Sequence, residues 1–497
     1  MKLIINGNVK PYYIQMLVML YFPGEKFPEG ESSDDGKRCE ISVASDAEGT
    51  RSAVTVTVDG KSAVGESFIS HGKFPEEKEA QFAAGGAFLE ACTSLTGHVP
   101  PWGMLTGVRP AKLALELLER GYTEEQTAAF FTDVYKTSRE KAVLATSAAL
   151  TSKRIVTPER RKECSVYIAI PFCPTRCSYC SFVSYTSPKL LSMIPDYLSV
   201  LTEDIRHTFG MIRELGLRLS SIYIGGGTPT VLSEQQLEML LSCIGECADT
   251  PGEFTLEAGR PDTITEVKLR SAASHGVTRV SVNTQTLNED VLRSIGRSHS
   301  TDDFFRAFDL ASGMGFRDIN VDLIAGLPGD TFDSFKDSVD RVCALEPSNI
   351  TVHTFSVKKS AEMKTEGLDV YDREGSVAAE SVEYSGKKLL ASSYIPYYMY
   401  RQKNTVGNLE NVGYSKAGHE GLYNIFMMDE IHTVFACGAS SVTKLVGADK
   451  NGEAVIKRLF EPKYPYEYLR PNNEDREAHR RRLFDTAREF YSSFGIK

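Results

Sequence analysis

The central segment of this chain reads Ser165-Val-Tyr-Ile-Ala-Ile-Pro-Phe-Cys-Pro-Thr-Arg-Cys-Ser-Tyr-Cys-Ser-Phe182. Its first part, Val166 to Ile170, is rich in β-branched side chains and predicts a buried strand. Cys173, Cys177 and Cys180 follow in one short loop with the spacing C-x3-C-x2-C. Three thiolates at this spacing can hold one face of a metal centre. An iron–sulfur cube held by three cysteines keeps one iron open for another ligand.

Two other interpretations of the cysteine loop stay open on spacing alone: a zinc site with a distant fourth ligand, and inert thiols. A structural zinc site needs four ligands, and the next Cys or His along the chain is His207, in a predicted helix. The neighbouring side chains favour the cluster, because a stiff apolar wall shields it from solvent. This wall is formed by Pro171, Phe172, Pro174, Tyr179 and Phe182.

Length and composition describe a globular protein. The 497 residues predict two to four domains. A hydrophobic content of 41% and a charged content of 25% are ordinary. The net charge of -10, from 56 basic and 66 acidic residues, argues against a nucleic-acid-binding protein. It leaves room for a small anionic substrate held by a few arginines.

The sequence predicts a cytoplasmic protein. The first residues, Met1-Lys-Leu-Ile-Ile-Asn6, suit a strand and carry no small-residue cleavage site. The most apolar run, Tyr12 to Phe22, is too short to span a bilayer. Apart from the central three, the ten cysteines are scattered, as is usual in a reducing compartment.

We expect four segments along the chain: an N-terminal α+β accessory domain (1–150), a linker (151–163), an α/β core (164–360) and a C-terminal substrate-side domain (361–497). In the first, strands are predicted at Lys2–Ile5, Glu40–Ala44 and Ala53–Val58, with a hairpin turn at Asp59-Gly60, and helices at Glu76–Leu95, Ala111–Glu119 and Thr123–Ser147. In the last, we expect helices at Arg373–Ser393 and Asn473–Ser493 and an edge strand at Ala454–Phe460.

The core alternates apolar strands with amphipathic helices. Strands are predicted at Val166–Ile170, Ser221–Ile224, Phe254–Glu257, Arg279–Asn283, Ile319–Ala325 and Ile350–Phe355. Helices are predicted at Tyr197–Leu215, Glu234–Glu246, Glu266–His275, Thr301–Met314 and Thr331–Leu345. Repeated strand–helix units imply parallel strands with right-handed crossovers. They are compatible with an open doubly wound sheet or a partial barrel, and both bind ligands at the carboxyl ends of the strands.

Polar residues do follow the predicted strands. They include Gly225-Gly-Gly-Thr-Pro229, Glu257, Arg260, Gln285, Asp322 and His353. Each also has a purely structural interpretation. The glycines suit a tight turn and match neither a dinucleotide nor a nucleotide-triphosphate loop. Glu257 and Asp322 are carboxylates in buried strands and need a partner or a ligand, whereas a single histidine is more often a satisfied core residue.

These motifs together resemble the radical S-adenosylmethionine (SAM) superfamily. Within it they are similar to the oxygen-independent coproporphyrinogen III oxidase (coproporphyrinogen dehydrogenase) family. The matching blocks are Tyr167-Ile-Ala-Ile-Pro-Phe-Cys173 with Cys177 and Cys180, Gly225-Gly-Gly-Thr-Pro-Thr230, Glu253-Phe-Thr-Leu-Glu257, Gln285, Arg297 and Asp322-Leu-Ile-Ala-Gly-Leu-Pro328. They cover roughly residues 165 to 360. Outside this region, the N-terminal part, Tyr400-Arg-Gln-Lys-Asn404 and Gly407-Asn-Leu-Glu-Asn-Val-Gly-Tyr414 are similar to the same family.

The resemblance implies a partial (β/α)6 barrel of the TIM type, an N-terminal α+β domain and a C-terminal α+β cap. It implies a [4Fe–4S] cluster ligated by Cys173, Cys177 and Cys180, and SAM bound to its fourth iron. The SAM contacts implied are Tyr167, Tyr179, Gly226, Gly227, Thr228, Glu257, Gln285, Arg297 and Asp322. The cluster ligands and Tyr167 would be the catalytic set.

The implied reaction is the oxidative decarboxylation of coproporphyrinogen III, a tetrapyrrole. A 5′-deoxyadenosyl radical takes a hydrogen atom from a propionate, and loss of CO2 and an electron leaves a vinyl group; two rounds give protoporphyrinogen IX. An electron donor such as flavodoxin or ferredoxin is the expected protein partner. We expect Arg260 and Arg401 to bind the anionic propionates.

The substrate is less well defined than the cofactors. The oxidases proper carry a fourth cysteine where Phe182 stands and a histidine where Ala169 stands, and the haem-carrier relatives share the phenylalanine. A haem carrier without turnover is therefore the main alternative, with His353, His419, Tyr414 or Cys437 as axial ligands. The long N-terminal region weighs against it, because the carriers are shorter. A different radical SAM reaction on a tetrapyrrole is the third possibility.

Overall fold

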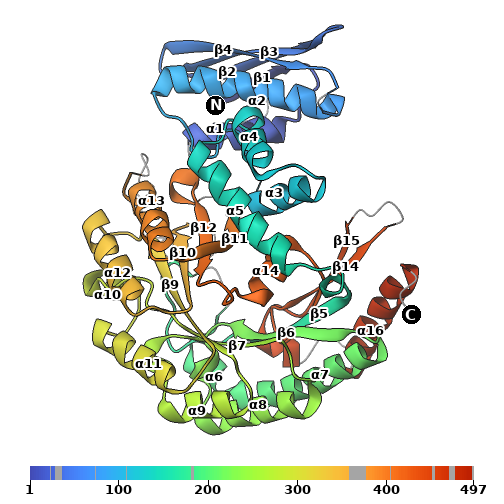
Figure 1. Ribbon diagram of the computed structural model, residues 1–497, viewed down its shortest axis with the longest axis vertical. Helices are drawn as coiled ribbons and strands as arrows, with labels where there is room; N and C mark the ends of the chain where they lie inside the picture. Colours follow the sequence, from blue (N-terminus) through green and yellow to red (C-terminus); the bar gives the residue numbers. More distant parts are fainter. Residues whose placement is uncertain are drawn as a thin grey trace. The chain divides into compact units, whose positions relative to one another are not determined.

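The computed structural model describes residues 1–22, 24–27, 36–72, 74–107, 109–180, 184–356, 376–402, 405–449, 454–469 and 476–494 (Figure 1). The chain divides into two compact units. The first contains residues 1–150 and two short segments from later in the chain, and the second contains nearly all of the remainder.

The first unit has a four-stranded sheet in the order β1 (Lys2–Asn6), β2 (Lys37–Ser45), β3 (Gly49–Val58) and β4 (Lys61–Ser70). The predicted hairpin turn at Asp59-Gly60 is confirmed, with positive φ angles of 51° and 78° that match the twist of β3 and β4. Two helices complete this layer, α1 (Pro11–Tyr21) and α2 (Glu76–Thr96), and α2 packs its alanine-rich face on the sheet.

Three further helices end this part of the chain: α3 (Pro110–Glu119), α4 (Glu124–Val134) and α5 (Arg139–Ile155). The prediction of one helix over Thr123–Ser147 was wrong, because the chain turns between α4 and α5. Lys136 adopts a left-handed conformation there with a φ of 58°, which ends a right-handed helix. The expected linker at 151–163 is largely ordered, since its first residues complete α5 and Glu163 begins β5.

The larger sheet has eleven strands in the order β11-β12-β10-β9-β8-β7-β6-β5-β13-β14-β15. Their bounds are β5 (Glu163–Ile170), β6 (Arg218–Gly226), β7 (Glu253–Gly259), β8 (Arg279–Val282), β9 (Asp318–Ala325), β10 (Asn349–Thr354), β11 (Ile395–Arg401), β12 (Glu410–Ser415), β13 (Thr433–Cys437), β14 (Val442–Ala448) and β15 (Ala454–Phe460). From β5 to β10 each strand lies parallel to the next in chain order. A doubly wound sheet would reverse its order at one point. The run without reversal, and the free edges at β11 and β15, confirm the partial barrel.

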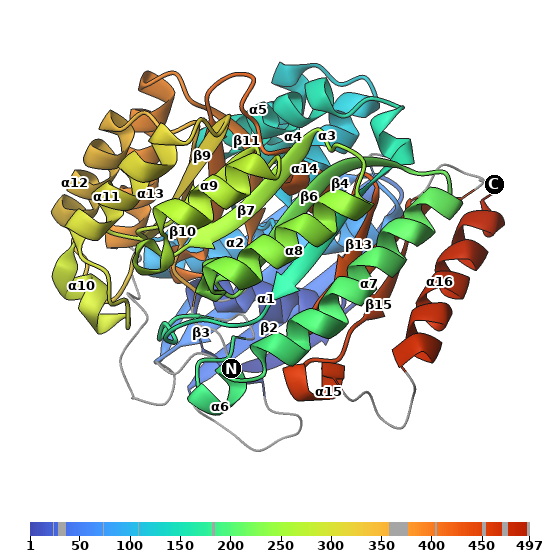
Figure 2. The same ribbon diagram turned by 90° about the horizontal axis from the view of Figure 1, so that it is seen from below.

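Helices of the repeat cover the outer face of the parallel strands (Figure 2). They are α7 (Ile194–Glu214), α8 (Glu234–Cys247), α9 (Glu266–Ser274), α11 (Thr301–Gly313) and α12 (Phe332–Ala344). Shorter or later helices are α6 (Pro188–Leu191), α10 (Glu289–Ser294), α13 (Ser376–Ala391), α14 (Leu422–Asp429), α15 (Pro465–Leu469) and α16 (Arg476–Ser493). Among the described residues, no helix combines the length and apolar character needed to cross a membrane.

The described residues of the segment 361–497 extend the barrel sheet at both of its edges. The substrate-side role expected for this segment stays a prediction. β13 pairs with β5 in parallel, and the β14–β15 hairpin continues the sheet from there. On the other side, β12 pairs antiparallel with β10. The predicted edge strand at Ala454–Phe460 is confirmed as β15. The start of each predicted helix, at Arg373 and Asn473, lies outside the described residues.

Candidate functional site at the carboxyl ends of the strands

The cysteine loop begins where β5 ends. The Cys173 amide donates to the Tyr185 carbonyl at 3.1 Å, and the Cys180 amide donates to the Cys177 carbonyl at 3.0 Å, which closes a tight turn. Cys173 and Cys177 are buried and Cys180 is half-buried. None of the ten cysteines, all of which lie in described residues, forms a disulfide. Phe182, one of the two positions at which this chain was expected to differ from the oxidases proper, lies outside the described residues.

The glycine motif after β6 packs directly against the segment that leads into this loop. The Gly227 and Thr228 amides donate to the carbonyls of Ile170 and Phe172, both at 2.8 Å. A side chain on Gly227 would place Cβ only 2.5 Å from the Phe172 oxygen, so this position must be glycine. The Thr228 hydroxyl donates to the Cys173 sulfur at 3.3 Å. The glycines therefore bring the ends of β5 and β6 together. The sequence alone does not distinguish this packing role from contact with a ligand.

Two carboxylates lie inside the barrel. Glu257 lies against the glycine motif, since Cβ of a side chain at Gly225 would come within 2.7 Å of its oxygen. Burial and the nearby charge of Asp322 raise the pKa of Glu257 to about 7. Asp322 accepts from the Asn320 amide at 2.7 Å and faces the His353 imidazole at 3.6 Å. Burial acts to raise the pKa of Asp322, but the contact with His353 brings it below its ordinary value.

Arg297 and Gln285 link these carboxylates to the cysteine loop through a series of intermediate contacts. The buried Arg297 guanidinium donates to the Asn283 carbonyl at 2.6 Å and to the Tyr179 hydroxyl at 3.4 Å. Burial acts to lower the pKa of Arg297, and its contacts with Tyr179 and Cys177 raise the pKa above its ordinary value. Gln285 has a positive φ of 74°, which its backbone bonds to β9 maintain.

Several buried polar atoms here have no partner. They are the Arg297 Nε, the Gln285 Oε1, the Ser178 hydroxyl and both ring nitrogens of His299. Burial, with the charge of Arg297, lowers the pKa of His299 to about 3, so its imidazole is neutral. Unsatisfied buried polar atoms are costly. Their concentration beside the cysteine loop indicates that this region is built to meet a polar ligand.

Three tyrosines, Tyr167, Tyr223 and Tyr423, line the barrel interior, and we call them the tyrosine column. The Tyr223 and Tyr423 rings stack with centroids 4.6 Å apart, and Tyr167 lies about 6 Å from both at small interplanar angles. Tyr167 was predicted as a site residue. Tyr223 could have been found because it shares the inward face of a predicted strand. Tyr423 lies on α14, and no local pattern places that helix inside the barrel.

The two arginines that we expected to bind propionates have other roles. Arg260 is buried and bonded to Asp262 and to Thr175 in the cysteine loop. Arg401 is buried in the first unit, where it donates to the Leu105 carbonyl and lies 5.2 Å from the centre of the Trp102 ring. Burial lowers the pKa of Arg401 to about 10. The prediction was wrong for both, since neither guanidinium is available to a bulky anion.

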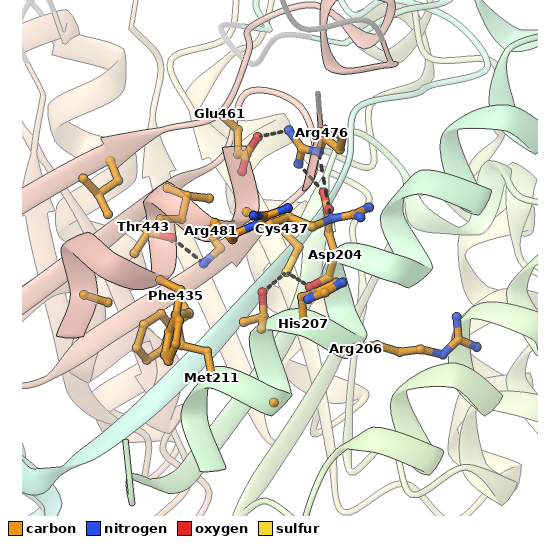
Figure 3. Close-up of a pocket in the computed structure, with 18 of the residues that line it drawn as sticks. Asp204, Arg206, His207, Met211, Phe435, Cys437, Thr443, Glu461, Arg476 and Arg481 are labelled. Carbon is orange, nitrogen blue, oxygen red and sulfur yellow. Dashed lines mark hydrogen bonds and ion pairs between the residues drawn. The ribbon is translucent and has the colours of Figure 1, made fainter. Parts of the chain in front are cut away.

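A cavity of about 410 Å³ lies elsewhere, between α7, β13, β14 and α16 (Figure 3). None of the predicted cluster or SAM ligands lines it, whereas Cys437, a candidate axial ligand of the haem carrier, does. Several of its charged groups are paired with each other: Asp204 binds Arg476 and Arg480, and Arg476 also binds Glu461 at 2.9 Å. These contacts attach α16 to α7, and Arg476 and Arg480 are half-buried ion-pair partners in them. We do not assign the cavity to the candidate site.

The residues present suit the expected cofactors. Within the described residues, no three His, Cys, Asp or Glu side chains are gathered as ligands of a single ion. The unpartnered Arg297 and Gln285 atoms and the ionisable Glu257 supply the cation, amide and carboxylate that an amino-acid group requires.

Comparison with known proteins gives consistent results. The sequence profile of the radical SAM superfamily matches residues 167–342. The oxygen-independent coproporphyrinogen-III oxidase-like protein HemZ of Bacillus subtilis (strain 168) is 34% identical over 388 residues, which are 77% of this chain and 76% of the relative. The heme chaperone HemW of the same organism is 36% identical over 197 residues, 39% of this chain and 51% of its own.

Among solved structures, coproporphyrinogen III oxidase (HemN) from Escherichia coli, described as a radical SAM enzyme, matches with a TM-score of 0.50. The match covers 65% of this chain and 71% of that one at 21% identity. At this identity the likeness establishes the fold alone.

Proposed function

The chain belongs to the family of oxygen-independent coproporphyrinogen-III oxidase-like proteins in the radical SAM superfamily, and from this premise we propose that it converts coproporphyrinogen III to protoporphyrinogen IX. Each round acts on one ionised propionate, –CH2–CH2–COO⁻. The abstracted hydrogen atom ends on 5′-deoxyadenosine, CO2 is lost, and an external one-electron acceptor takes the remaining electron, which leaves a vinyl group. The [4Fe–4S] cluster and SAM, when bound, supply the radical chemistry for the hydrogen abstraction.

The residues of this chain would hold these cofactors by charge and hydrogen bonding. Cys173, Cys177 and Cys180 are the cluster ligands in this proposal. Arg297 meets the carboxylate of SAM, and Glu257 meets its amino group. The remaining proposed contacts are Tyr167, Tyr179, Gly226, Gly227, Thr228, Gln285 and Asp322. A protein such as flavodoxin or ferredoxin would supply the electron that starts turnover.

One observation carries the proposal: at the carboxyl ends of the strands, where the cysteine loop begins, Arg297 has an unpartnered guanidinium nitrogen, Gln285 has an unpartnered oxygen and the Glu257 carboxyl has a pKa of about 7. A zwitterionic ligand satisfies all three. Without it, the Arg297 nitrogen and the Gln285 oxygen would stay buried without a hydrogen-bond partner, at a cost of about 1–3 kcal/mol each.

Two findings favour the oxidase over the haem carrier. The similarity to the oxidase-like relative extends over 77% of the chain, whereas the similarity to the chaperone relatives covers 39–62%. Candidate axial ligands also have internal partners. His353 faces Asp322 at 3.6 Å, His419 bonds to Asp318 at 2.6 Å, and the buried Cys437 thiol lies 3.2 Å from the Thr208 hydroxyl.

The haem carrier remains the second candidate because the heme chaperone relative is 36% identical in the matched region. One experiment separates the functions. The chain is reconstituted without oxygen and supplied with SAM, a reductant and coproporphyrinogen III, and 5′-deoxyadenosine and CO2 are measured. Both products together support the oxidase. Deoxyadenosine without CO2 indicates a different radical reaction, and tight haem uptake with neither product supports the carrier.

A further inference from the structure

Arg260 makes an unusually complete set of bonds for a single guanidinium. It follows β7 directly and is 2% exposed. Its Nε and Nη2 atoms donate to the two oxygens of Asp262 at 3.0 and 2.9 Å, and Nη2 also donates to the Ser298 hydroxyl at 3.0 Å. Its Nη1 atom donates to the Thr175 hydroxyl at 2.6 Å and to the Thr175 carbonyl at 3.3 Å. All three nitrogens of the planar fork are therefore in use.

Thr175 lies inside the cysteine loop, between Cys173 and Cys177. Its hydroxyl connects Arg260 to Gly296, because it accepts from Arg260 and donates to the Gly296 carbonyl at 3.1 Å. The Ser178 amide donates to the Ile295 carbonyl at 3.1 Å. The loop is thus attached at two points to residues 295–296, which are next to Arg297.

The local sequence explains how the fork is oriented. Pro261 begins a short 3-10 turn, Pro261–Thr263, which places Asp262 where both of its oxygens meet the fork of its neighbour Arg260. Gly296 has a positive φ of 77°, and a side chain there would lie 2.9 Å from the Arg176 carbonyl oxygen. The backbone of segment 295–298 therefore approaches the cysteine loop as closely as a glycine allows.

We propose that Arg260 is a positioning residue for the cluster: it ties the cysteine loop to the end of β7 and to segment 295–298, and so fixes the spacing of the three thiols. The inference rests on the proposed function, which places a cluster in this loop. It goes further by assigning the rigidity of the loop to one buried guanidinium that is bonded to Asp262, Ser298 and Thr175. Outer residues that orient metal ligands commonly change metal affinity by about 10–100-fold when they are removed.

The test compares two buried arginines. Arg260→Gln removes the fork beside the cysteines. Arg279→Gln removes an equally buried fork, bonded to Glu253 and Asp318, at the opposite ends of the strands. Both variants are reconstituted without oxygen, and iron release to a chelator is followed well below either melting temperature. We expect release to be about tenfold faster for Arg260→Gln and unchanged for Arg279→Gln.

The electron paramagnetic resonance spectrum of the reduced cluster supplies a second readout that lower stability alone would not move. Arg260→Gln should broaden or shift this spectrum, and Arg279→Gln should leave it as in the unsubstituted chain. An unchanged release rate and spectrum for Arg260→Gln would overturn the inference. Equal acceleration in both variants would overturn it too, because the effect would then follow stability.

Thr175 provides variants that leave the arginine in place. Thr175→Val removes the hydroxyl that bonds to Arg260 and Gly296, and Thr175→Ser retains it. We expect faster iron release for the valine variant and near-normal release for the serine variant. The double variant Arg260→Gln/Thr175→Val should add little to Arg260→Gln alone, because both act on one contact. If the unsubstituted chain itself takes up no cluster, the proposed function fails, and that outcome is distinct from normal iron release in these variants.

Discussion

The two ends of the parallel strands use the same residue types for different purposes. At the amino ends, the first residues of β7, β8, β9 and β10 are Glu253, Arg279, Asp318 and Asn349. All four are buried, and Arg279 bonds to each of the other three. None of their buried side-chain nitrogen or oxygen atoms lacks a partner. At this end of the barrel the protein satisfies its own buried charged and polar groups, and we call it the closed end.

The carboxyl ends also carry buried arginines and carboxylates, but their bonding is incomplete. Arg297 and Gln285 each retain an unpartnered buried atom, and burial raises the pKa of Glu257 to about 7. The comparison shows that burial and charge alone do not identify a binding site. What separates the two ends is whether the protein satisfies its own polar groups or leaves them for a ligand.

The closed end also supports the interior. The two oxygens of Glu253 accept from the Leu422 and Tyr423 amides at 2.8 and 3.0 Å, which caps the first turn of α14. This cap holds the Tyr423 ring against Tyr223 inside the barrel. A residue at the amino ends of the strands therefore positions an aromatic group that faces the candidate site.

The sharpest difference between the two ends is expected from Cys177→Ala. If the cysteine loop holds a cluster, loss of one of three ligands should abolish it, because the remaining open coordination is already assigned to SAM. We expect the visible iron–sulfur absorbance and the iron content to fall to background after anaerobic reconstitution. Cys247→Ala on α8 is the matched control and should keep its iron. Full iron content in Cys177→Ala would remove the cluster assignment.

The closed end should respond in stability and not in cofactor content. Arg279→Gln leaves the Glu253 and Asp318 carboxylates buried without their cation, and breaking such a pair costs about 3–5 kcal/mol. Denaturant unfolding of the apo chain measures this loss. Arg317 contacts the same Asp318 from a position that is 45% exposed, so Arg317→Gln should cost less than about 1 kcal/mol. Equal losses in the two variants would contradict the distinction.

Much of this architecture could be predicted from the sequence, because the repeat of strands and helices has a strong local signature. The six parallel strands and the five helices between them were placed to within a few residues. The polar residues at the carboxyl ends of the strands, among them Glu257, Gln285 and Asp322, follow from the same register. A strand fixes which end a residue occupies, and parallel strands bring those ends to one edge.

The remaining features depend on partners that no local pattern specifies. Arg260 was expected to face the substrate, but the turn at Asp262 and the contact with Thr175 bury it. Tyr423 enters the barrel only because Glu253, far away in the sequence, caps α14. The pairing of β13 with β5 likewise joins segments separated by most of the core. Each of these features depends on which long-range contacts form, and the local sequence pattern is compatible with several sets of such contacts.

At the carboxyl ends of the strands, which we call the open end, a change at Arg297 should weaken SAM binding without removing the cluster. A hydrogen bond to a charged group contributes about 1.5–3 kcal/mol, so Arg297→Gln should reduce SAM affinity by roughly 10–100-fold. Equilibrium dialysis of the reconstituted protein against SAM measures it. Arg293→Gln, at a largely exposed arginine on α10, should bind SAM normally. Unaltered affinity in Arg297→Gln would place the SAM carboxylate elsewhere.

The smallest effect is expected from pH, and it tests whether Glu257 is poised for a ligand. Burial and Asp322 raise the pKa of Glu257 to about 7, so its carboxyl is protonated at pH 6 and ionised at pH 8. If the carboxylate binds the SAM amino group, SAM affinity should rise about tenfold between these values, in proportion to the ionised fraction.

The same pKa has the opposite consequence for the empty protein. A carboxyl whose pKa is higher in the folded than in the unfolded state stabilises the fold at pH values below its unfolded pKa. That contribution is lost as the pH rises through about 7. The apo chain should therefore lose the Glu257 contribution to stability over the range in which SAM affinity increases. Glu257→Gln should remove the pH dependence of both SAM affinity and stability. The tyrosine column, whose residues are neutral, should contribute to neither. If SAM affinity were independent of pH in the unsubstituted chain, Glu257 would be one more satisfied buried group, and the contrast between the two ends would rest on Arg297 and Gln285 alone.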